Sequence, residues 1–209
     1  MHCGTSCIVL FVKPPLPGRV KTRLARDIGD EAACTIYLTL VERVLANIAA
    51  SDLPLVIFYD GDNADQLPLA WREAAQICIP QQGSDLGERM ANALGQLFSD
   101  GIEEAVLIGS DIPGLNTGYL HDAFRALATN DLVIGPAIDG GYCLIGFHSS
   151  TFTPPLFQQI PWSSGQVLEL TLSAAEAARL SVGLLPPLRD IDTLDDLIHI
   201  SGHRANCTI

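Results

Sequence analysis

Cationic side chains gather in one short stretch of an otherwise acidic chain. The 209 residues carry 12 Lys and Arg against 24 Asp and Glu, which gives a formal charge of −12. Five of those cations stand within fourteen positions: Lys13, Arg19, Lys21, Arg23 and Arg26. A cluster that opposes the net charge of its chain creates a local positive field that attracts anions. The stretch therefore predicts a binding loop for a phosphorylated ligand; the alternative is a solvated basic loop with no ligand.

The residues around these cations favour a loop at the edge of a sheet. The apolar run Ile8–Val12 is typical of a buried strand, and K-P-P-L-P-G follows it at once. The three prolines exclude a helix or a paired strand, and Gly18 frees the backbone. In open α/β sheets ligands bind outside the carboxyl ends of strands. The loop matches neither the Walker A nor the G-x-G-x-x-G pattern. Its candidate ligand-binding residues are Lys13, Gly18, Arg19, Lys21 and Arg23.

Two acidic segments could face this loop. Asp111 follows the apolar run 105–108 directly, within G-S-D-I-P-G, which places it at the carboxyl edge of the same sheet. Asp190 and Asp192 alternate around Ile191 and should project on the side away from it. Carboxylates in such positions bind Mg²⁺ together with phosphate oxygens. The alternatives are that Asp111 bonds turn amides, and that Asp192 or Thr193 caps a final helix.

A turn and a tryptophan add candidates for binding a sugar or an acceptor. Asp139-Gly140-Gly141 is typical of a hairpin turn, and its glycines would also allow a ligand to approach the backbone closely. Trp162 could stack on a sugar or a base, or could belong to the core. Asp139 is the candidate general base for an acceptor hydroxyl.

Strands that alternate with helices must position these residues. Runs with strand character occur at 8–12, 55–59, 75–79, 105–108, 132–135, 142–147 and 182–185. Helical spacing occupies 30–50, 85–98 and 116–128, with further helices after 163 and 193. Asp85 with Glu88, and Ser163 with Gln166, have the spacing of capping boxes. The pattern predicts a three-layer α/β/α sandwich with a mostly parallel, mixed sheet, in which the strands on either side of Asp139 form an antiparallel pair.

Length and composition limit the classes of protein that fit. The chain suits a single domain over residues 1–209, and 48% hydrophobic residues argue against disorder. The negative charge argues against nucleic acid or anionic membranes as partners. The apolar runs have strand length, and the start of the chain has no signal-peptide pattern, so we expect no membrane span and a cytoplasmic protein. The six cysteines form no C-x-x-C pair, which favours free thiols in a reducing compartment.

Six segments in order resemble one known family. They are F-V-K-P-P-L-P-G-R-V-K-T-R-L-A from Phe11, D-L-G-E-R-M from Asp85, G-S-D-I-P from Gly109, D-G-G-Y-C-L-I-G from Asp139, I-P-W-S from Ile160 and D-I-D-T from Asp190. Together they resemble the DUF2064 family of bacterial glycosyltransferases, which implies the GT-A fold of nucleotide-diphospho-sugar transferases. A more distant similarity is to 2-phospho-lactate guanylyltransferases. The glycine-rich loop of nucleotidyltransferases, G-G-x-G-x-R, is replaced here by prolines.

The resemblance implies roles for the candidate residues. Asp111, Asp190 and Asp192 would bind one Mg²⁺ or Mn²⁺, and the first loop would hold the nucleotide phosphates. The catalytic candidates are Asp111, Asp139 and Lys21. The candidates for binding substrate are Lys13, Gly18, Arg19, Lys21, Arg23, Asp85, Gly140, Gly141 and Trp162.

Three functions fit these residues. The leading hypothesis is a metal-dependent glycosyltransferase that uses a nucleoside-diphosphate sugar and a small-molecule acceptor. The second is a nucleotidyltransferase that joins a nucleoside triphosphate to a phosphorylated small acceptor. The third is a non-catalytic sensor of a nucleotide or phosphorylated ligand on the same fold. The oligomeric state is left open.

Overall fold

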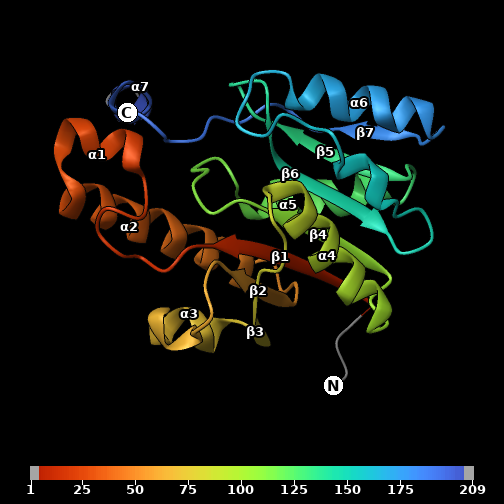
Figure 1. Ribbon diagram of the computed structural model, residues 1–209, viewed down its shortest axis with the longest axis horizontal. Coiled ribbons are helices and arrows are strands. Elements are labelled where there is room, and N and C mark those ends of the chain that lie inside the picture. The colour runs from red at the N-terminus through yellow and green to blue at the C-terminus, as the bar shows by residue number, and fades with distance from the viewer. Residues whose placement is uncertain (1–4, 205–209) are drawn as a thin grey trace.

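The computed structural model describes residues 5–204, which form one seven-stranded sheet (Figure 1). The strand order is β3-β2-β1-β4-β6-β5-β7. All neighbouring pairs are parallel except those that β6 makes with β4 and with β5. The strands are β1 (Ser6–Val12), β2 (Leu55–Tyr59), β3 (Ile77–Pro80), β4 (Glu104–Ile108), β5 (Leu132–Pro136), β6 (Tyr142–His148) and β7 (Val182–Leu184). The predicted mixed, mostly parallel sheet is confirmed, including the antiparallel pair around Asp139.

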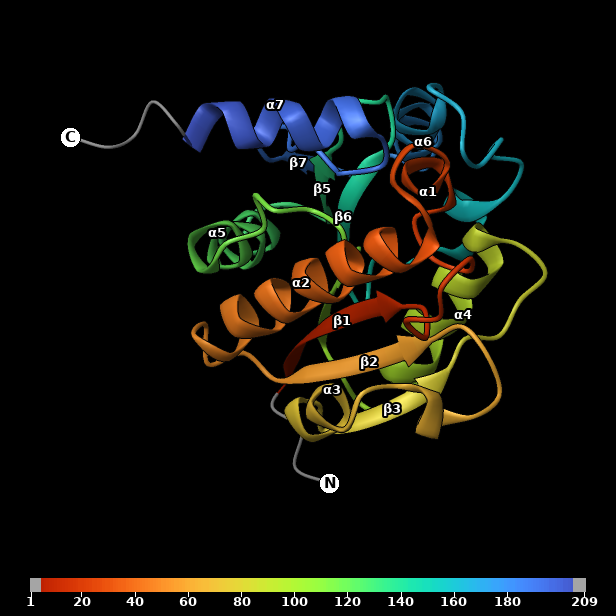
Figure 2. The same cartoon turned by 90° about the vertical axis from the view of Figure 1, so that its left-hand side faces the viewer.

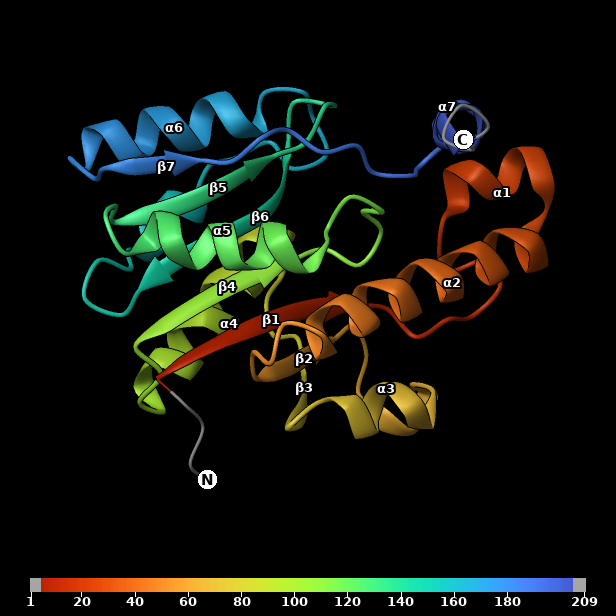
Figure 3. The same cartoon turned by 180° about the vertical axis from the view of Figure 1, so that it is seen from behind.

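Helices cover both faces of the sheet. The view of Figure 1 looks onto α4 and α6, and the view from behind in Figure 3 looks onto α2 and α5. The helices are α1 (Thr22–Ile28), α2 (Asp30–Ala49), α3 (Leu69–Ala74), α4 (Leu86–Ser99), α5 (Thr117–Leu127), α6 (Val167–Ala177) and α7 (Leu194–Arg204), with short 3₁₀ turns at η1 (Ala64–Gln66) and η2 (Pro154–Phe157). The predicted three-layer α/β/α arrangement is therefore present.

The central strand β1 shows why the sequence makes two cores. Its side chains alternate between the two faces of the sheet. Ile8, Leu10 and Val12 pack against the side of α2 and α5, whereas Cys7 and Val9 pack against the side of α4. Because both faces are covered, the strand is a continuous apolar run, and four of its residues are fully buried.

Two local predictions need correction, and both concern helix starts. Thr22–Ile28 forms α1, a helix that the sequence analysis left within the loop. Ser163 and Gln166 do not form a capping box, because Ser163 has a left-handed backbone (φ 67) and α6 begins at Val167 without a side-chain cap. Asp85 does cap α4 by accepting a hydrogen bond from the Glu88 amide at 2.8 Å. The Glu88 carboxylate completes this turn by accepting from Ser84.

One helix among the described residues has the length and composition of a membrane span. This is α2, with a mean hydropathy of 1.4. The buried core helix of a soluble protein can have the same length and composition. Eight of its residues are buried: Ala33, Cys34, Tyr37, Leu40, Val41, Val44, Leu45 and Ile48. Since six of these side chains belong to the core beneath β1, a core helix accounts for the pattern.

Candidate active site

A basic pocket lies where the loop after β1 meets the ends of β3 and β4. It encloses about 640 Å³. Its lining includes Lys13, Arg19, Lys21, Arg23, Gln81, Ser84, Asp85, Arg89, Ser110, Asp111 and Asp192. All these strands run the same way, so their carboxyl ends meet at one edge of the sheet. Five cations at one sheet edge give a site that attracts a polyanion such as a diphosphate.

Tyr37 of α2 holds the start of the basic loop in place. Its hydroxyl accepts a hydrogen bond from the Lys13 amide at 2.9 Å and donates to the Lys13 carbonyl at 3.2 Å. The Ser110 hydroxyl donates a hydrogen bond to the Tyr37 hydroxyl oxygen at 3.4 Å. Burial raises the pKa of Tyr37 to about 12, so the phenol stays neutral at physiological pH and can both donate and accept. One buried residue thus ties the loop after β1 to the loop after β4.

Replacing Tyr37 with Phe should loosen the basic loop. The Lys13 amide and carbonyl would lose their partner, and we expect a loss of about 2 kcal/mol in unfolding free energy and a tenfold weaker affinity for a nucleoside diphosphate. Urea unfolding and calorimetric titration measure the two effects. Tyr119→Phe is the matched control, because it removes a tyrosine hydroxyl that donates a 2.9 Å hydrogen bond to the Pro186 carbonyl, at a tyrosine that lines neither pocket. Equal losses of nucleotide affinity in both variants would contradict this role for Tyr37.

Lys21 is the best-anchored cation of the basic pocket. Its ammonium lies 2.6 Å from Asp111 Oδ2 and 2.9 Å from Asp192 Oδ1, and only 4% of the side chain is exposed. Burial by itself lowers the pKa of Lys21, but the charges of Asp111 and Asp192 outweigh it and raise the pKa above its usual value. Lys21 also precedes the first turn of α1 and has a left-handed backbone (φ 48). Arg23 adds a weaker contact, 3.5 Å to Asp192 Oδ2.

Backbone contacts bring the two predicted acidic segments together. The Ile191 amide donates to the Asp111 carbonyl at 3.2 Å. Ile191 itself is buried against Leu24 of α1 and residues of α2, close to where α7 packs on α1 (Figure 2). Thr193, not Asp192, caps α7, through a hydrogen-bonded pairing with Asp196. Asp192 is therefore free to pair with Lys21, which the sequence left open.

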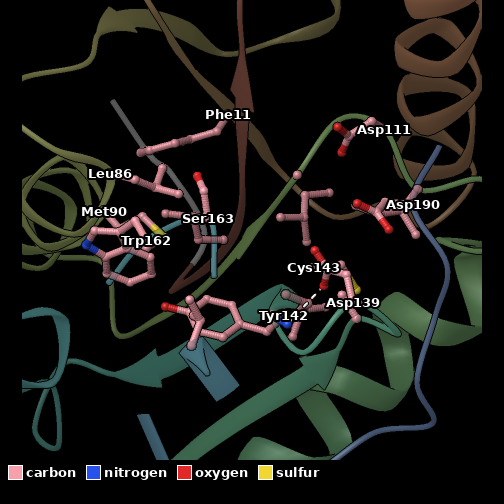
Figure 4. Close-up of a pocket in the computed structure, with 18 of the residues that line it drawn as sticks. Phe11, Leu86, Met90, Asp111, Asp139, Tyr142, Cys143, Trp162, Ser163 and Asp190 are labelled. Atoms are coloured by element: carbon pink, nitrogen blue, oxygen red, sulfur yellow. Dashed lines mark hydrogen bonds between the residues drawn. The ribbon is translucent and has the colours of Figure 1, made fainter. Parts of the chain in front are cut away.

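A second, apolar pocket adjoins the basic one and shares Asp111 and Phe11 with it. It encloses about 230 Å³. Figure 4 shows its two sides: Asp111, Asp139 and Asp190 on one, and Leu86, Met90, Tyr142 and Trp162 on the other. Asp190 and Asp192 flank the buried Ile191, and Asp190 lines the apolar pocket whereas Asp192 lines the basic one. The last acidic segment thus contributes one carboxylate to each pocket.

Asp190 is a carboxyl of this pocket whose pKa is raised. Burial first, and then the neighbouring charges of Asp139, Asp192 and Asp111, raise its pKa to about 6. A carboxyl that titrates near neutral pH is suited to accept a proton. Asp139, the base expected from the sequence, accepts a hydrogen bond from the Gly141 amide at 2.9 Å, so one of its oxygens serves the turn. The raised pKa of Asp190 and the hydrogen bond that occupies Asp139 therefore favour Asp190 over Asp139 as a base.

The predicted metal ligands are neighbours but are not arranged around a cation site. Their all-oxygen donor set suits Mg²⁺ or Mn²⁺. Within residues 5–204, however, no three Asp, Glu, His or Cys side chains are placed to hold one ion. The ammonium of Lys21 lies between Asp111 and Asp192, where a shared ion would sit. In this arrangement the residues do not fit a divalent cation, and the ligand set of Asp111, Asp190 and Asp192 stays a prediction.

Gly87 determines how close Trp162 lies to α4. A Cβ added at Gly87 would lie 2.5 Å from Trp162 Cζ2 and would also meet the Phe157 carbonyl. The indole packs edge-on to Tyr142, with ring centroids 6.3 Å apart and planes at 88°. Trp162 is thus both a partner of the core and a wall of the apolar pocket.

The variant Gly87→Ala should displace Trp162. Overpacking of this kind costs about 1–3 kcal/mol, and the indole should become more exposed. Thermal unfolding and tryptophan emission measure both changes. Gly95→Ala in the same helix is the control, because its Cβ would meet only Phe152 at an ordinary 3.6 Å, and alanine raises helix propensity there. We expect Gly95→Ala to be as stable as the parent or more so; if Gly87→Ala behaves likewise, the contact with Trp162 is not tight.

The remaining predicted binding residues fall in different places. Asp85 lines the basic pocket but also caps α4. Gly141 lines the apolar pocket. Gly140 has a left-handed backbone (φ 91), and its Cβ would collide with the backbone of Gly165, so its small size serves packing between two loops. Gly18 (φ 76) lies near the Asp30 carboxylate and lines neither pocket.

Tyr37 and Arg89 are among the site residues that the sequence did not indicate. Tyr37 looked like one more apolar position of α2. Arg89 lies within D-L-G-E-R-M, a segment that was quoted but not assigned a cation role. Arg89 lines the basic pocket, pairs with Asp60 at 2.9 Å and donates to the Gly83 carbonyl at 3.2 Å. The position of the motif at the start of a helix after a strand could have indicated it.

Comparison with known proteins identifies the family and the fold of the chain. A family model for uncharacterized proteins conserved in bacteria, DUF2064, matches residues 44–164. A solved structure from Desulfovibrio desulfuricans G20, provisionally named a nucleotide-diphospho-sugar transferase, is 39% identical, covers 98% of this chain and 90% of its own, and has a TM-score of 0.90. The chain belongs to the DUF2064 family. The fold of this DUF2064 protein is that of the nucleotide-diphospho-sugar transferases.

A more distant relative and a protein of the same fold are named as enzymes that transfer nucleotides. The DUF2064 chain is 25% identical over 147 residues to 2-phospho-L-lactate guanylyltransferase from Methanocaldococcus jannaschii. That match covers 69% of this chain and 61% of the archaeal enzyme, less than two thirds of its length. A cytidylyltransferase from Leptospira borgpetersenii shares the fold at 15% identity, with a TM-score of 0.60 and 98% of each chain covered.

Proposed function

We propose that this protein is a glycosyltransferase that transfers a sugar from a nucleoside-diphosphate sugar to a small hydroxyl-bearing acceptor. The observation that carries the proposal is the division of charge between two adjoining pockets. The basic pocket suits a diphosphate, because it is lined by Lys13, Arg19, Lys21, Arg23 and Arg89. The described lining of the apolar pocket contains carboxylates but no Lys, Arg or His. The sugar would lie near Asp111, where the two pockets join.

The proposed reaction is a direct displacement at the sugar. The acceptor oxygen forms a bond to the anomeric carbon as the bond from that carbon to the diphosphate oxygen breaks. The acceptor proton passes to the carboxylate of Asp190, and the nucleoside diphosphate leaves with the electron pair. Lys21, Arg19 and Arg23 neutralise the charge that develops on the leaving diphosphate. Asp111 and Asp192 position Lys21 for this role.

Similarity to the archaeal guanylyltransferase supports a second candidate, nucleotidyl transfer. In that reaction an acceptor phosphate attacks the α-phosphorus of a triphosphate, and pyrophosphate leaves. The acceptor phosphate would need cations of its own, and the cations of this site all lie in the basic pocket. Glycosyl transfer therefore fits the geometry better. We also propose a cytoplasmic location, because Cys34, Cys78 and Cys143 are free thiols.

Product analysis separates the two reactions. The purified protein is incubated with UDP-, GDP- and dTDP-sugars, and separately with nucleoside triphosphates and a phosphorylated acceptor, each with Mg²⁺, with Mn²⁺ or with EDTA. We expect release of a nucleoside diphosphate from one sugar nucleotide and no pyrophosphate from the triphosphates. Pyrophosphate release would establish the second candidate, and binding without any turnover would indicate a sensor. The EDTA arm measures the predicted requirement for a divalent cation.

A further inference from the structure

The apolar pocket has the chemistry of a site for an uncharged or cationic ring. Its inner side is formed by Trp162, Tyr142 and Met90, and its opposite side by carboxylates (Figure 4). About 230 Å³ is room for one ring rather than for an extended molecule. Aromatic faces bind other rings through apolar contact, and they bind cations through the negative electrostatic potential of the ring face.

The charges around the pocket exclude anionic ligands. Asp111, Asp139 and Asp190 line it, whereas Lys21, the cation that pairs with Asp111, is also held by Asp192 and lines the basic pocket. A phosphate or carboxylate in the apolar pocket would face like charges with no cation among its described lining residues. Like-charge contacts of this kind select against wrong partners.

We propose that the acceptor is a hydroxyl compound with an aromatic or apolar ring and no negative charge. The ring would lie against Trp162 and Met90, and the hydroxyl would point to Asp190 on the opposite side. This inference rests on the proposed function, because it names the acceptor for that same site. Its selectivity against anions is a property of the pocket that can be measured without any donor.

The test follows the emission of Trp162 during titration with three probes. The chain has two tryptophans, and Trp71 is buried in the core beneath α2, so a Trp71→Phe background leaves Trp162 as the reporter. The probes are phenyl β-D-glucoside, tyramine and phenyl phosphate, which are neutral, cationic and anionic; inorganic phosphate controls for binding in the basic pocket. We expect saturable changes with the first two and at least hundredfold weaker binding of phenyl phosphate. Equal binding of phenyl phosphate would overturn the proposal.

A variant that adds a positive charge should gain affinity for phenyl phosphate, which a structural defect could not produce. Leu86 lines both pockets and is 46% exposed, so Leu86→Lys places an ammonium at the pocket without burying it. This variant should bind phenyl phosphate at least tenfold more tightly than the parent. Leu69→Lys on α3 adds the same charge at an exposed position outside both pockets and should leave the probe affinities unchanged. No gain in Leu86→Lys, or the same gain in Leu69→Lys, would refute the inference.

Failure of this inference can be told apart from failure of the proposed function. Release of nucleoside diphosphate from a sugar nucleotide by slow transfer to water needs no acceptor. If that release occurs but the probes are bound regardless of charge, only the acceptor inference fails. If the probes are discriminated but no sugar nucleotide is turned over, the proposed function fails and the selectivity of the pocket stands.

Discussion

Replacing Lys21 with methionine should abolish most activity and destabilise the fold. Methionine keeps the length of the side chain but removes the ammonium that touches Asp111 and Asp192. Two carboxylates would then face each other across an apolar side chain. Because both are about one third exposed, we expect a loss of about 2 kcal/mol, less than for a fully buried pair. The release of nucleoside diphosphate should fall by at least a hundredfold.

The pH dependence of this effect follows from the sign of the shift. The pKa of Lys21 is raised in the folded state, so its contribution is fully present below the usual lysine pKa and is lost only at more alkaline pH. The destabilisation of Lys21→Met should therefore be constant between pH 7 and 9. Urea unfolding at three pH values measures it.

Two further variants test whether the loss of charge pairing at Lys21 causes the destabilisation. Arg43→Met removes an exposed cation of α2 that lies outside both pockets. It should leave activity unchanged and should alter stability by no more than about 0.5 kcal/mol. In Lys21→Met/Asp192→Asn the repulsion is relieved, so stability should recover while activity stays low. If the double variant is no more stable than Lys21→Met, charge pairing is not what Lys21 contributes to the fold.

Replacing Asp190 with asparagine should remove the pH dependence of the reaction near pH 6. As the proposed base, Asp190 must be ionised, so the rate in the parent protein should rise with pH and level off above its pKa of about 6. Asp190→Asn should lower the plateau by at least a hundredfold. Asp139→Asn removes one charge that raises the pKa of Asp190, so its profile should shift to lower pH. An unchanged profile in Asp190→Asn would assign the base elsewhere.

As the pH rises from about 4 to 6, the stability of the parent protein should fall while its activity rises. The pKa of Asp190 is higher in the folded than in the unfolded state, so the folded protein binds the proton more tightly. Stability therefore falls as pH rises from about 4 to 6, and the loss persists at neutral pH. Allowing for solvent screening at this half-buried carboxyl, Asp190→Asn should be more stable than the parent by about 1 kcal/mol at pH 7 and equal to it at pH 4. Thermal unfolding at the two pH values checks this.

The sheet and most helices could be predicted from the sequence, because their signals are local. Apolar runs such as Ile8–Val12 and Leu55–Tyr59 are buried on both faces, and the spacing in Asp30–Ala49 places one apolar face on the sheet. The position of Asp111 after β4 likewise followed from a strand that ends in glycine. Parallel strands bring their carboxyl ends to one edge, so the meeting of the basic loop with Asp111 was predictable too, whereas its meeting with Asp190 and Asp192 was implied by the family resemblance.

Helix α1 could not be predicted, because little in its own residues favours it. Leu24 is its one buried residue, and no side chain caps it. What stabilises it is packing: Leu24 contacts the apolar side chains of α2, and Ile191 and α7, more than 160 positions further along the chain, complete the cluster. Ser163 shows the reverse case: its capping-box spacing with Gln166 was present, but the left-handed backbone that the tertiary structure imposes prevents the box.

The sequence by itself determined the fold, the family and the edge of the sheet where the site lies. Only the tertiary structure decided how charge is divided there: Lys21 between Asp111 and Asp192, and Asp190 in a pocket whose described lining has no cation. The reason is physical. Secondary structure follows from the periodicity of neighbouring residues, whereas a pairing between Lys21 and residues 90 and 171 positions away depends on how loops from different strands pack.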